Sequence, residues 1–250
     1  MVEQAEIWKP TCNRFVAFLD IMGFREMVLR KSHEDVREML ESLYPTIEIM
    51  KEETTKRFKR DANKDKEHKP DVITGVLPIL FSDSIIFVSS DDSSESAYEI
   101  LLYSMWILNQ AITDGIPMKG AIAHGEQTAY LEKSLCFGKP LIDAYELQQE
   151  LQIYGVILHH TMEKHLIENN FIHSIEKDKY ISKWDVPMKS GDITHYLVNW
   201  ASESMTEKEV LDMITKLYVS VSGNPRLYVD NTLDFVHWVT EKKAEVKQAK

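Results

Sequence analysis

The stretch RFVAFLDIMGF, residues 14–24, constrains the fold of this chain more than any other. Its first half is a run of aromatic, aliphatic and β-branched residues that predicts a short buried strand. The strand ends at Asp20, and Gly23 precedes a helical pattern. A carboxylate in this position is suited to holding a hard cation, and the glycine lets backbone N–H groups approach an anionic ligand. On the residues alone, an equally good alternative is that Asp20 caps the following helix.

A second acid, Asp83, lies between two further apolar segments. The run VLPILFSDSIIFVS, residues 76–89, predicts two strands hinged near Ser82 and Asp83. The order strand–Asp, helix, strand–Asp–strand is expected to bring both carboxylates to one edge of a sheet. Facing carboxylates repel unless a cation lies between them, and Mg²⁺ commonly uses one or two carboxylates plus substrate phosphates. The pair therefore predicts a metal-dependent nucleotide site.

The composition restricts the class of protein and its partners. The chain has 250 residues, enough for one large domain or two small ones with a full core. Its formal net charge of −11 argues against nucleic acid or an anionic membrane as a partner. The sequence shows neither a bilayer-spanning apolar run nor an N-terminal signal pattern. Cys12 and Cys136 are widely separated and match no disulfide framework or zinc motif, so we predict a cytoplasmic protein with buried thiols.

A helical pattern follows the first strand over residues 25–51, with Ser32 and Asp35 marking an internal N-cap. Tyr44 belongs to its apolar face, but an alternative is that Tyr44 reaches the nucleotide site. Residues 52–71 are densely charged and predict a solvated, flexible segment. The residues that recur at helical spacing are expected in the core: Leu40, Leu43, Tyr44, Ile47 and Met50.

Further along, apolar patterning predicts helices and strands in alternation. His124 ends one strand beside a glycine, and a structural role is favoured there over a metal ligand. His159 and His160 are expected to begin a helix, where adjacent side chains point apart. The expected elements are helices at 97–113 and 142–151, strands at 118–124, 153–158 and 193–200, a connection at 128–136, and short strands within 171–184.

This order of elements predicts an α+β fold with a ferredoxin-like βαββαβ core that is extended at its end. Residues 1–200 are expected to form that domain. Residues 201–250 differ, because amphipathic patterns at 205–221 and 233–248 flank a turn. We expect this C-terminal helical pair to pack on the same domain, and the alternative that the residues leave open is a dimer surface.

Five segments resemble, in order, the catalytic domain of the class III nucleotidyl (adenylate and guanylate) cyclases. They span residues 14–199, most of the chain, and their order makes the resemblance more specific than any one of them. FLDIMGF and FSDSIIF are similar to the two segments that carry the family's metal-binding aspartates. The remaining three are PMKGAIAHGE, FGKPLIDAYELQQE and SGDITHYLVN.

The resemblance implies two Mg²⁺ or Mn²⁺ ions held by Asp20, Asp83 and the backbone carbonyl of Ile21. It further implies a homodimer with shared active sites that converts a nucleoside triphosphate to a 3′,5′-cyclic nucleotide and pyrophosphate. Lys189 lies one position from a family lysine that contacts phosphate, and a solvated turn lysine is an equally good alternative. Backbone groups that would hold the triphosphate are those of Met22, Gly23 and Phe24.

Departures from the family pattern bear on the substrate. The family's two base-reading positions fall at Ile79 and near Leu135, which cannot read a purine edge by hydrogen bonds. The positions of its transition-state asparagine and arginine fall at Ile142 and Glu146, and a glutamate would repel a triphosphate. The segment FLDIMGF and the variant AYEL resemble those of the Pycsar pyrimidine cyclases of bacterial anti-phage defence. This resemblance implies UTP or CTP as substrate, and a separate effector protein that responds to the cyclic product.

Two other classes of function stay open on the sequence. One is a catalytically degenerate cyclase fold that binds nucleotide or serves as an interaction module. Retention of both Asp20 and Asp83 favours the enzyme over this module, because binding alone has no need of two facing acids. The other class, a phosphohydrolase that uses the same acids, ranks last because the chain lacks a recognisable water-activating His/Asp cluster.

Overall fold

The fold is described by a computed structural model that covers most of the chain. The expected charged segment at 52–71 lies outside the described residues, apart from residue 52. The residues that the structure describes are 8–50, 52, 75–130, 133–201, 207–218 and 223–248.

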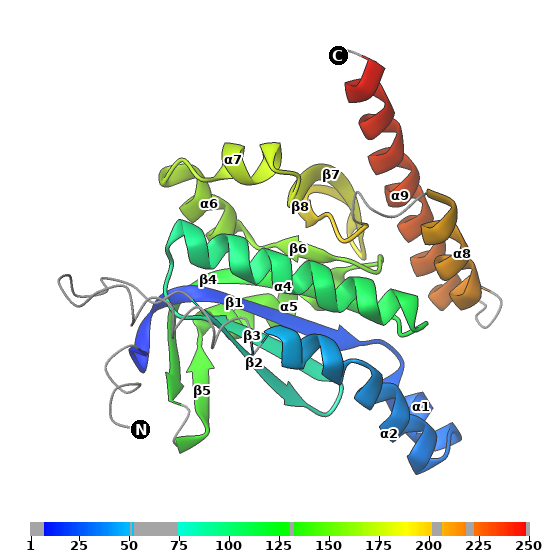
Figure 1. The fold of residues 1–250 in the computed structure, drawn as a ribbon, viewed down its shortest axis with the longest axis horizontal. Helices are drawn as coiled ribbons and strands as arrows, with labels where there is room; N and C mark the ends of the chain where they lie inside the picture. Colours follow the sequence, from blue (N-terminus) through cyan, green and yellow to red (C-terminus); the bar gives the residue numbers. More distant parts are fainter. Residues whose placement is uncertain are drawn as a thin grey trace.

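Four strands form the core of the sheet. They are β1 (Thr11–Ile21), β2 (Val76–Phe81), β3 (Ser84–Ser89) and β4 (Met118–Tyr130), and they lie in the order β2-β3-β1-β4. All three pairings are antiparallel. With one helical region between β1 and β2 and another between β3 and β4, this is the ferredoxin-like βαββαβ topology (Figure 1). The predicted fold class is confirmed.

The sheet continues beyond this core on one side. Strand β6 (Val156–Leu158) pairs in parallel with β4, and β8 (Gly191–Val198) and β7 (Ile181–Met188) follow it by antiparallel pairing. A short strand, β5 (Leu135–Gly138), pairs with the far end of β4. The extension matches the expected addition of strands after the core.

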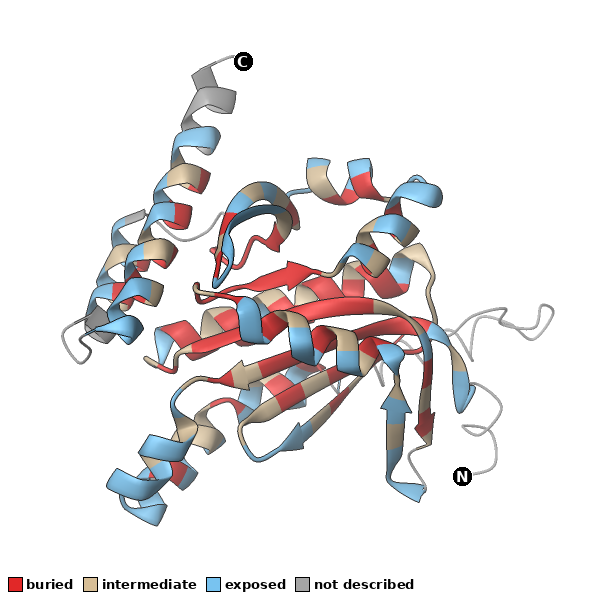
Figure 2. Ribbon diagram, turned by 180° about the vertical axis from the view of Figure 1, so that it is seen from behind, coloured by how far each residue is buried: buried red, intermediate tan, exposed pale blue. Residues whose placement is uncertain are grey.

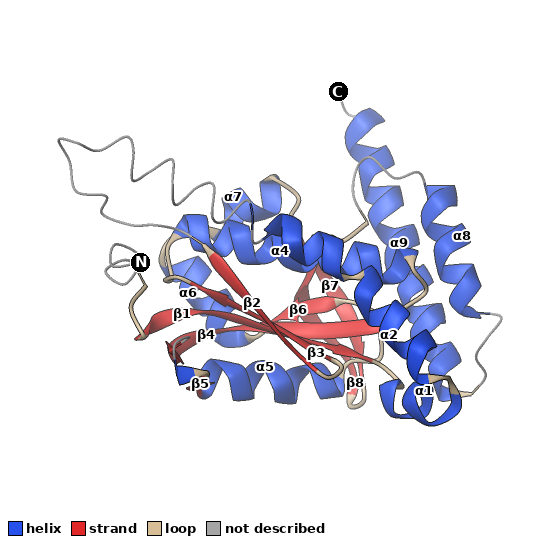
Figure 3. Cartoon of the chain, turned by 60° about the horizontal axis from the view of Figure 1, so that its bottom comes forward, coloured by secondary structure: helices blue, strands red, loops and turns tan. Residues whose placement is uncertain are grey.

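Helices cover both faces of the sheet. In Figure 3, α4 (Ser94–Thr113) lies over one face and α5 (Lys139–Glu150) over the other. Residues of β1 alternate between these faces, as a strand requires. Phe18 contacts the ring of Tyr145 on α5, with ring centroids 5.2 Å apart. Its neighbour Leu19 is fully buried in the main core.

Short helices follow β1. The first two are α1 (Phe24–Arg30) and α2 (His33–Ser42), and residues 44–50 are also helical. The break between α1 and α2 is the predicted internal cap. The side chain of Ser32 accepts a hydrogen bond from the Asp35 backbone N–H, and the Asp35 carboxylate accepts one from the Ser32 backbone N–H. Two orphan backbone donors are thereby satisfied, which explains why the helical pattern divides at this point.

Two expectations for the second half of the chain are wrong. The predicted connection at 128–136 is partly strand, because β4 continues to Tyr130 and pairs with β5. The predicted short strands within 171–184 are a helix, α7 (Ile172–Lys177), followed by the start of β7. Ile172 and Ile175 are both buried, so their spacing of three residues serves a helix packed on the domain.

The remaining helices are α6 (His160–Glu168), α8 (Glu207–Tyr218) and α9 (Asn224–Gln248). His159 is the N-cap of α6, at the predicted start of this helix. The expectation that the side chains of His159 and His160 point apart is wrong, because their ring centroids lie 4.0 Å apart. The inward side of α9 is buried (Figure 2), where Phe235 contacts Trp184 with ring centroids 5.2 Å apart. Among the described residues, no helix combines the length and apolar character needed to cross a bilayer.

Candidate functional site

The two acids singled out in the sequence lie at one end of the sheet. Asp20 is the penultimate residue of β1, and its cross-strand partner is Ser84, the residue after Asp83. The Ile21 backbone N–H donates to the Asp83 carbonyl oxygen at 2.9 Å, which ties the end of β1 to the β2–β3 turn. Ser82 opens this two-residue turn with φ of 57°, the positive value that a tight hairpin needs at its first turn residue. Both acids are half-buried.

Asp20 carries an unfavourable charge in this position. Its pKa is raised from the ordinary value of 3.8 to about 6, mainly by burial and then by the negative charge of Asp83, against an opposing effect of Lys119. The folded chain holds this proton more tightly than the unfolded chain. Ionisation of Asp20 therefore destabilises the fold as the pH rises through this range. A divalent cation would remove that penalty, so the donor set of Asp20, Asp83 and nearby backbone carbonyls fits Mg²⁺ or Mn²⁺.

The alternative role of Asp20 as a helix cap is not observed. The N-cap of α1 is Gly23, which has φ of 73° and accepts a hydrogen bond from the Met27 backbone N–H. No side chain caps this helix. The turn that leads to it is fixed by a hydrogen bond from the Met22 backbone N–H to the Pro117 carbonyl oxygen at 2.8 Å. The Asp20 carboxylate thus remains available to a ligand, and the backbone of Met22 and Gly23 follows it directly.

Lys119 is a component of this site that the sequence analysis missed. It lies directly opposite Asp20 in the β1–β4 pair, so both side chains stand on the same face of the sheet. Its Nζ donates to the carbonyl oxygens of Gln149 and Leu151 at 3.4 and 3.3 Å. Burial and the charge of Lys189 lower the pKa of Lys119 to about 8, against opposing effects of Asp20 and Glu150. The signal available in the sequence was a lysine at the start of an otherwise apolar strand.

Lys189 also lies in this cluster of charges. Its backbone N–H donates to the Glu150 carbonyl oxygen at 2.8 Å, and its Nζ is 3.8 Å from Glu150 Oε1. Its positive charge reaches Lys119 strongly enough to lower that pKa. The structure therefore brings Lys189 near Lys119, the residue opposite Asp20, although 169 positions separate Lys189 from Asp20 in the sequence. A lysine pair beside two carboxylates supplies the local positive charge that an anionic substrate needs in a chain of net charge −11.

The other predicted site residues are placed less closely. Ile79 pairs with Ile86, which pairs with Phe18, so Ile79 shares the α5 face of the sheet with Asp20. Leu135 lies on β5 and is 45% exposed. Tyr44 is 49% exposed, on a stretch whose neighbours Leu43 and Ile47 are fully buried. Its role in nucleotide binding stays a prediction.

No protein-family model matches the chain, and no curated protein matches it. Solved structures that resemble it include the catalytic core of a rhodopsin-guanylyl cyclase with converted specificity in complex with ATPαS. The two chains are 14% identical with a TM-score of 0.46, and the match covers 76% of this chain and 98% of that one. A bacterial light-regulated adenylyl cyclase gives 12% identity and a TM-score of 0.46, covering 84% and 100% of the two chains.

A third similar structure is a class III adenylyl cyclase-like ATP-binding protein from Pseudomonas aeruginosa. It is 10% identical, with a TM-score of 0.45, over 93% of this chain and 44% of that one.

The raised pKa of Asp20 leads to a prediction about metal binding. We expect the affinity for Mn²⁺ to fall about tenfold per pH unit below about pH 6 and to level off above it, because the proton on Asp20 competes with the cation. Paramagnetic resonance of free Mn²⁺, titrated with protein over a pH series, measures this affinity. The Asp20→Asn variant reports cation binding elsewhere and is subtracted. An affinity that stays constant well below pH 6 would contradict the prediction.

Proposed function

We propose that this protein is a metal-dependent nucleotidyl cyclase that converts a pyrimidine nucleoside triphosphate, UTP or CTP, to a 3′,5′-cyclic monophosphate and pyrophosphate. The observation that carries the proposal is the meeting of Asp20 and Asp83 at the end of β1, where the negative charge of Asp83 contributes to the raised pKa of Asp20. Two half-buried acids that repel each other cost stability without a cation. Their order and surroundings match the segments that resemble class III cyclases.

The chain's own residues have distinct roles in this proposal. Asp20, Asp83 and the Ile21 carbonyl would hold two Mg²⁺ or Mn²⁺ ions. When bound, such ions activate the ribose 3′-hydroxyl and neutralise the pyrophosphate leaving group. The backbone of Met22, Gly23 and Phe24 would receive the triphosphate.

We assign the two lysines to the same anionic substrate. Lys189 is about half exposed and is free to swing from Glu150 toward a phosphate. Lys119 is buried, with its Nζ held by carbonyl oxygens of α5 and the following turn. We therefore expect Lys189 to contact phosphate and Lys119 to act as a fixed positive charge beside Asp20. Electrostatic groups held in place before the reaction cost no reorganisation during it.

The choice of a pyrimidine rests on the apolar base-reading positions. Ile79 on the α5 face and Leu135 on β5 offer no hydrogen-bond donor or acceptor from their side chains. A purine selected by its polar edge would leave that edge unpaired at such a site, and sites that read polar groups discriminate by pairing them. A pyrimidine is smaller, so its polar edge need not reach these apolar positions.

The proposal extends to assembly and context. We propose a cytoplasmic homodimer whose two active sites are shared between the subunits, with residues 1–200 as the catalytic domain and 201–250 as a helical extension packed on it. Thr232 on α9 supports this packing, because its Oγ1 accepts a hydrogen bond from the Tyr154 backbone N–H at 3.0 Å. The cyclic product would act as a second messenger on a separate effector protein, as in anti-phage signalling.

A turnover screen tests the proposal. Purified protein is incubated separately with ATP, GTP, CTP and UTP in the presence of Mn²⁺, and products are identified by mass spectrometry. We expect cyclic UMP or cyclic CMP and no cyclic purine. A cyclic purine would retain the reaction class and overturn the roles of Ile79 and Leu135.

The second candidate function is a degenerate module that binds nucleotide without turnover. The exposed glutamate at 146, in the position of the family's arginine, favours it. Intact nucleotide binding without any cyclic product, under conditions where the dimer forms, would support this module and contradict the cyclase.

A further inference from the structure

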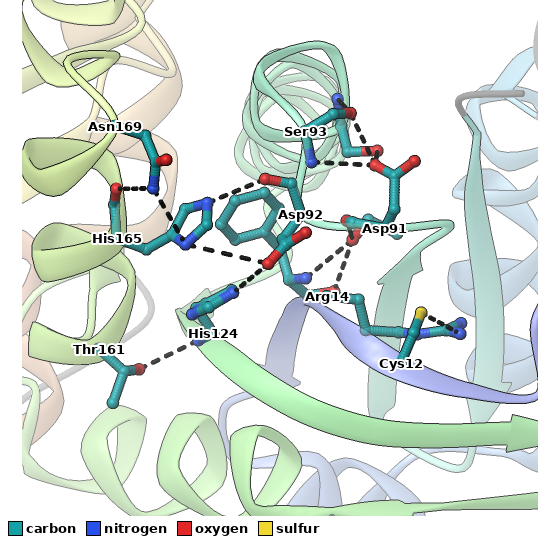
Figure 4. A network of polar contacts seen from close by, with 12 residues as sticks. Cys12, Arg14, Asp91, Asp92, Ser93, His124, Thr161, His165 and Asn169 are labelled. Atoms are coloured by element: carbon teal, nitrogen blue, oxygen red, sulfur yellow. Dashed lines mark hydrogen bonds and ion pairs between the residues drawn. The ribbon is translucent and has the colours of Figure 1, made fainter. Parts of the chain in front are cut away.

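A second group of side chains that can ligate a metal meets near the end of β3 that is opposite Asp83. Asp92 lies in the β3–α4 loop, His124 on β4 and His165 on α6, and one ligand atom from each lies within 4.8 Å of the others (Figure 4). The two histidine side chains are only 14% and 15% exposed, whereas Asp92 is 35% exposed. The two imidazoles therefore form the less exposed side of the group, and solvent reaches it from the side of Asp92.

The distances within this group are those of a metal centre that closes when the ligands move inward, since all three ligand atoms lie within 4.8 Å of one another. Metal–nitrogen and metal–oxygen bonds of about 2.0–2.2 Å place two tetrahedral ligands about 3.3 Å apart. Asp92 Oδ2 is 3.1 Å from His124 Nε2 and 4.0 Å from His165 Nδ1. A small shift of the His165 ring completes the set, and the exposed side of Asp92 leaves a position for water.

Hydrogen bonds already orient the His165 ring. Its Nε2 is 2.9 Å from the Asp92 backbone carbonyl oxygen, which can only accept, so Nε2 carries the proton. Nδ1 is then the unprotonated nitrogen, 4.0 Å from Asp92 Oδ2 and 3.5 Å from Asn169 Nδ2. A metal-ligating imidazole also donates its other N–H to a carbonyl, and a bound metal would replace the Asn169 amide as the partner of Nδ1. Phe15 forms an apolar wall behind both imidazoles, with ring centroids 5.3 Å from His124 and 5.4 Å from His165.

The loop that carries Asp92 is fixed by its neighbour. Asp91 Oδ1 accepts hydrogen bonds from the Ser93 backbone N–H, from Ser93 Oγ and from Ser96 Oγ. Ser93 in turn caps α4, because its Oγ accepts a hydrogen bond from the Ser96 backbone N–H at 3.2 Å. Asp92 faces the two histidines from this loop, so the position of the third ligand is fixed by the hydrogen bonds of Asp91.

We propose that Asp92, His124 and His165 bind one Zn²⁺ ion, with water as the fourth ligand. Two imidazole nitrogens and one carboxylate suit a borderline transition metal, whereas Mg²⁺ prefers oxygen ligands alone. The site is separate from the acids of the proposed cyclase site and does not rest on that function. His124 is five residues from Lys119 on β4, so the two lie about 16 Å apart and on opposite faces of the sheet.

Bound Zn²⁺ would link three elements that are distant in sequence. The start of α4, the middle of β4 and α6 otherwise meet through side-chain packing and single hydrogen bonds, such as that from the His124 backbone N–H to Thr161 Oγ1. Because the unfolded chain lacks the preformed site, binding free energy becomes folding free energy. We therefore expect Zn²⁺ to raise the melting temperature.

The test uses untagged full-length protein stripped of metal with a chelator. Co²⁺, which reports its coordination by visible absorption, is titrated first, and Zn²⁺ is then titrated in competition. We expect one ion per chain with the intense absorption of tetrahedral Co²⁺, and at least about 100-fold weaker binding at that site in His124→Gln, His165→Gln and Asp92→Asn, because even outer-shell changes cost about 10–100-fold. The melting temperature gained with Zn²⁺ is expected to be lost in each variant.

Two controls separate this site from others. His173→Gln removes an exposed histidine of α7, and Asp178→Asn removes an exposed acid outside both proposed sites; both are expected to bind Co²⁺ as the unaltered protein does. If a histidine variant fails to fold, Asp92→Asn decides, because Asp92 is partly exposed in a loop that Asp91 holds. Absence of saturable binding, or unchanged affinity in Asp92→Asn, would overturn the proposal and leave a hydrogen-bonded polar cluster.

Discussion

Replacing Asp83 by asparagine is expected to lower cyclic nucleotide formation at least about 1,000-fold, equivalent to about 4 kcal/mol in the activation barrier. The amide keeps the size of the carboxylate but removes the charge that would hold a cation beside Asp20. Asp83 is only half-buried in a turn whose backbone bond to Ile21 the substitution preserves. Asp20→Asn should give the same loss. Initial rates with Mn²⁺ and the preferred triphosphate measure both.

The matched control is Asp178→Asn, which changes an exposed acid at the end of α7 that accepts a hydrogen bond from Tyr98. Its turnover should equal that of the unaltered protein. Circular dichroism and thermal melting establish that all three variants remain folded. Wild-type rates in either Asp20→Asn or Asp83→Asn would show that the two acids do not form the catalytic metal site.

Gly120→Ala is expected to destabilise the fold by about 2–3 kcal/mol, because it overpacks the contact between β1 and β4. A Cβ at Gly120 would lie 2.6 Å from the Phe18 carbonyl oxygen and 2.9 Å from Leu19 Cγ. The first of these is backbone, so relief requires the two strands to move apart. The melting temperature should fall by about 5–10 °C for a chain of this length.

Gly155→Ala provides the matched control for this effect. Its Cβ would meet only side-chain atoms, the nearest being Leu197 Cδ1 at 3.1 Å, which can move by rotation. We expect a change of less than about 1 kcal/mol in the free energy of unfolding. Equal melting temperatures for the two variants would contradict the argument. Since Gly120 follows Lys119, the Gly120 variant should also lose turnover at temperatures where it remains folded.

Local sequence determined the core architecture and the two acids. The alternation of apolar strands and helices predicted the βαββαβ order because each element's period of hydrophobic residues is set by its own geometry. The capping box at Ser32 and Asp35 was likewise readable, since both partners lie within one turn of chain. Asp20 and Asp83 were found because each follows a strand pattern directly.

Contacts between elements that are distant in the sequence could not be predicted from these local patterns. Lys119 lies opposite Asp20 only because of the register of β4 against β1. Helix α7 is stabilised because Ile172 and Ile175 are buried against the rest of the domain. His124 read alone is a structural histidine. Asp92 and His165 reach it from a loop and a helix 32 and 41 positions away in the sequence. The period of apolar residues indicates which face of a helix or strand is buried. Which residues contact that face depends on the packing of the whole chain. For this reason only the tertiary structure decided the partners of Asp20 and His124.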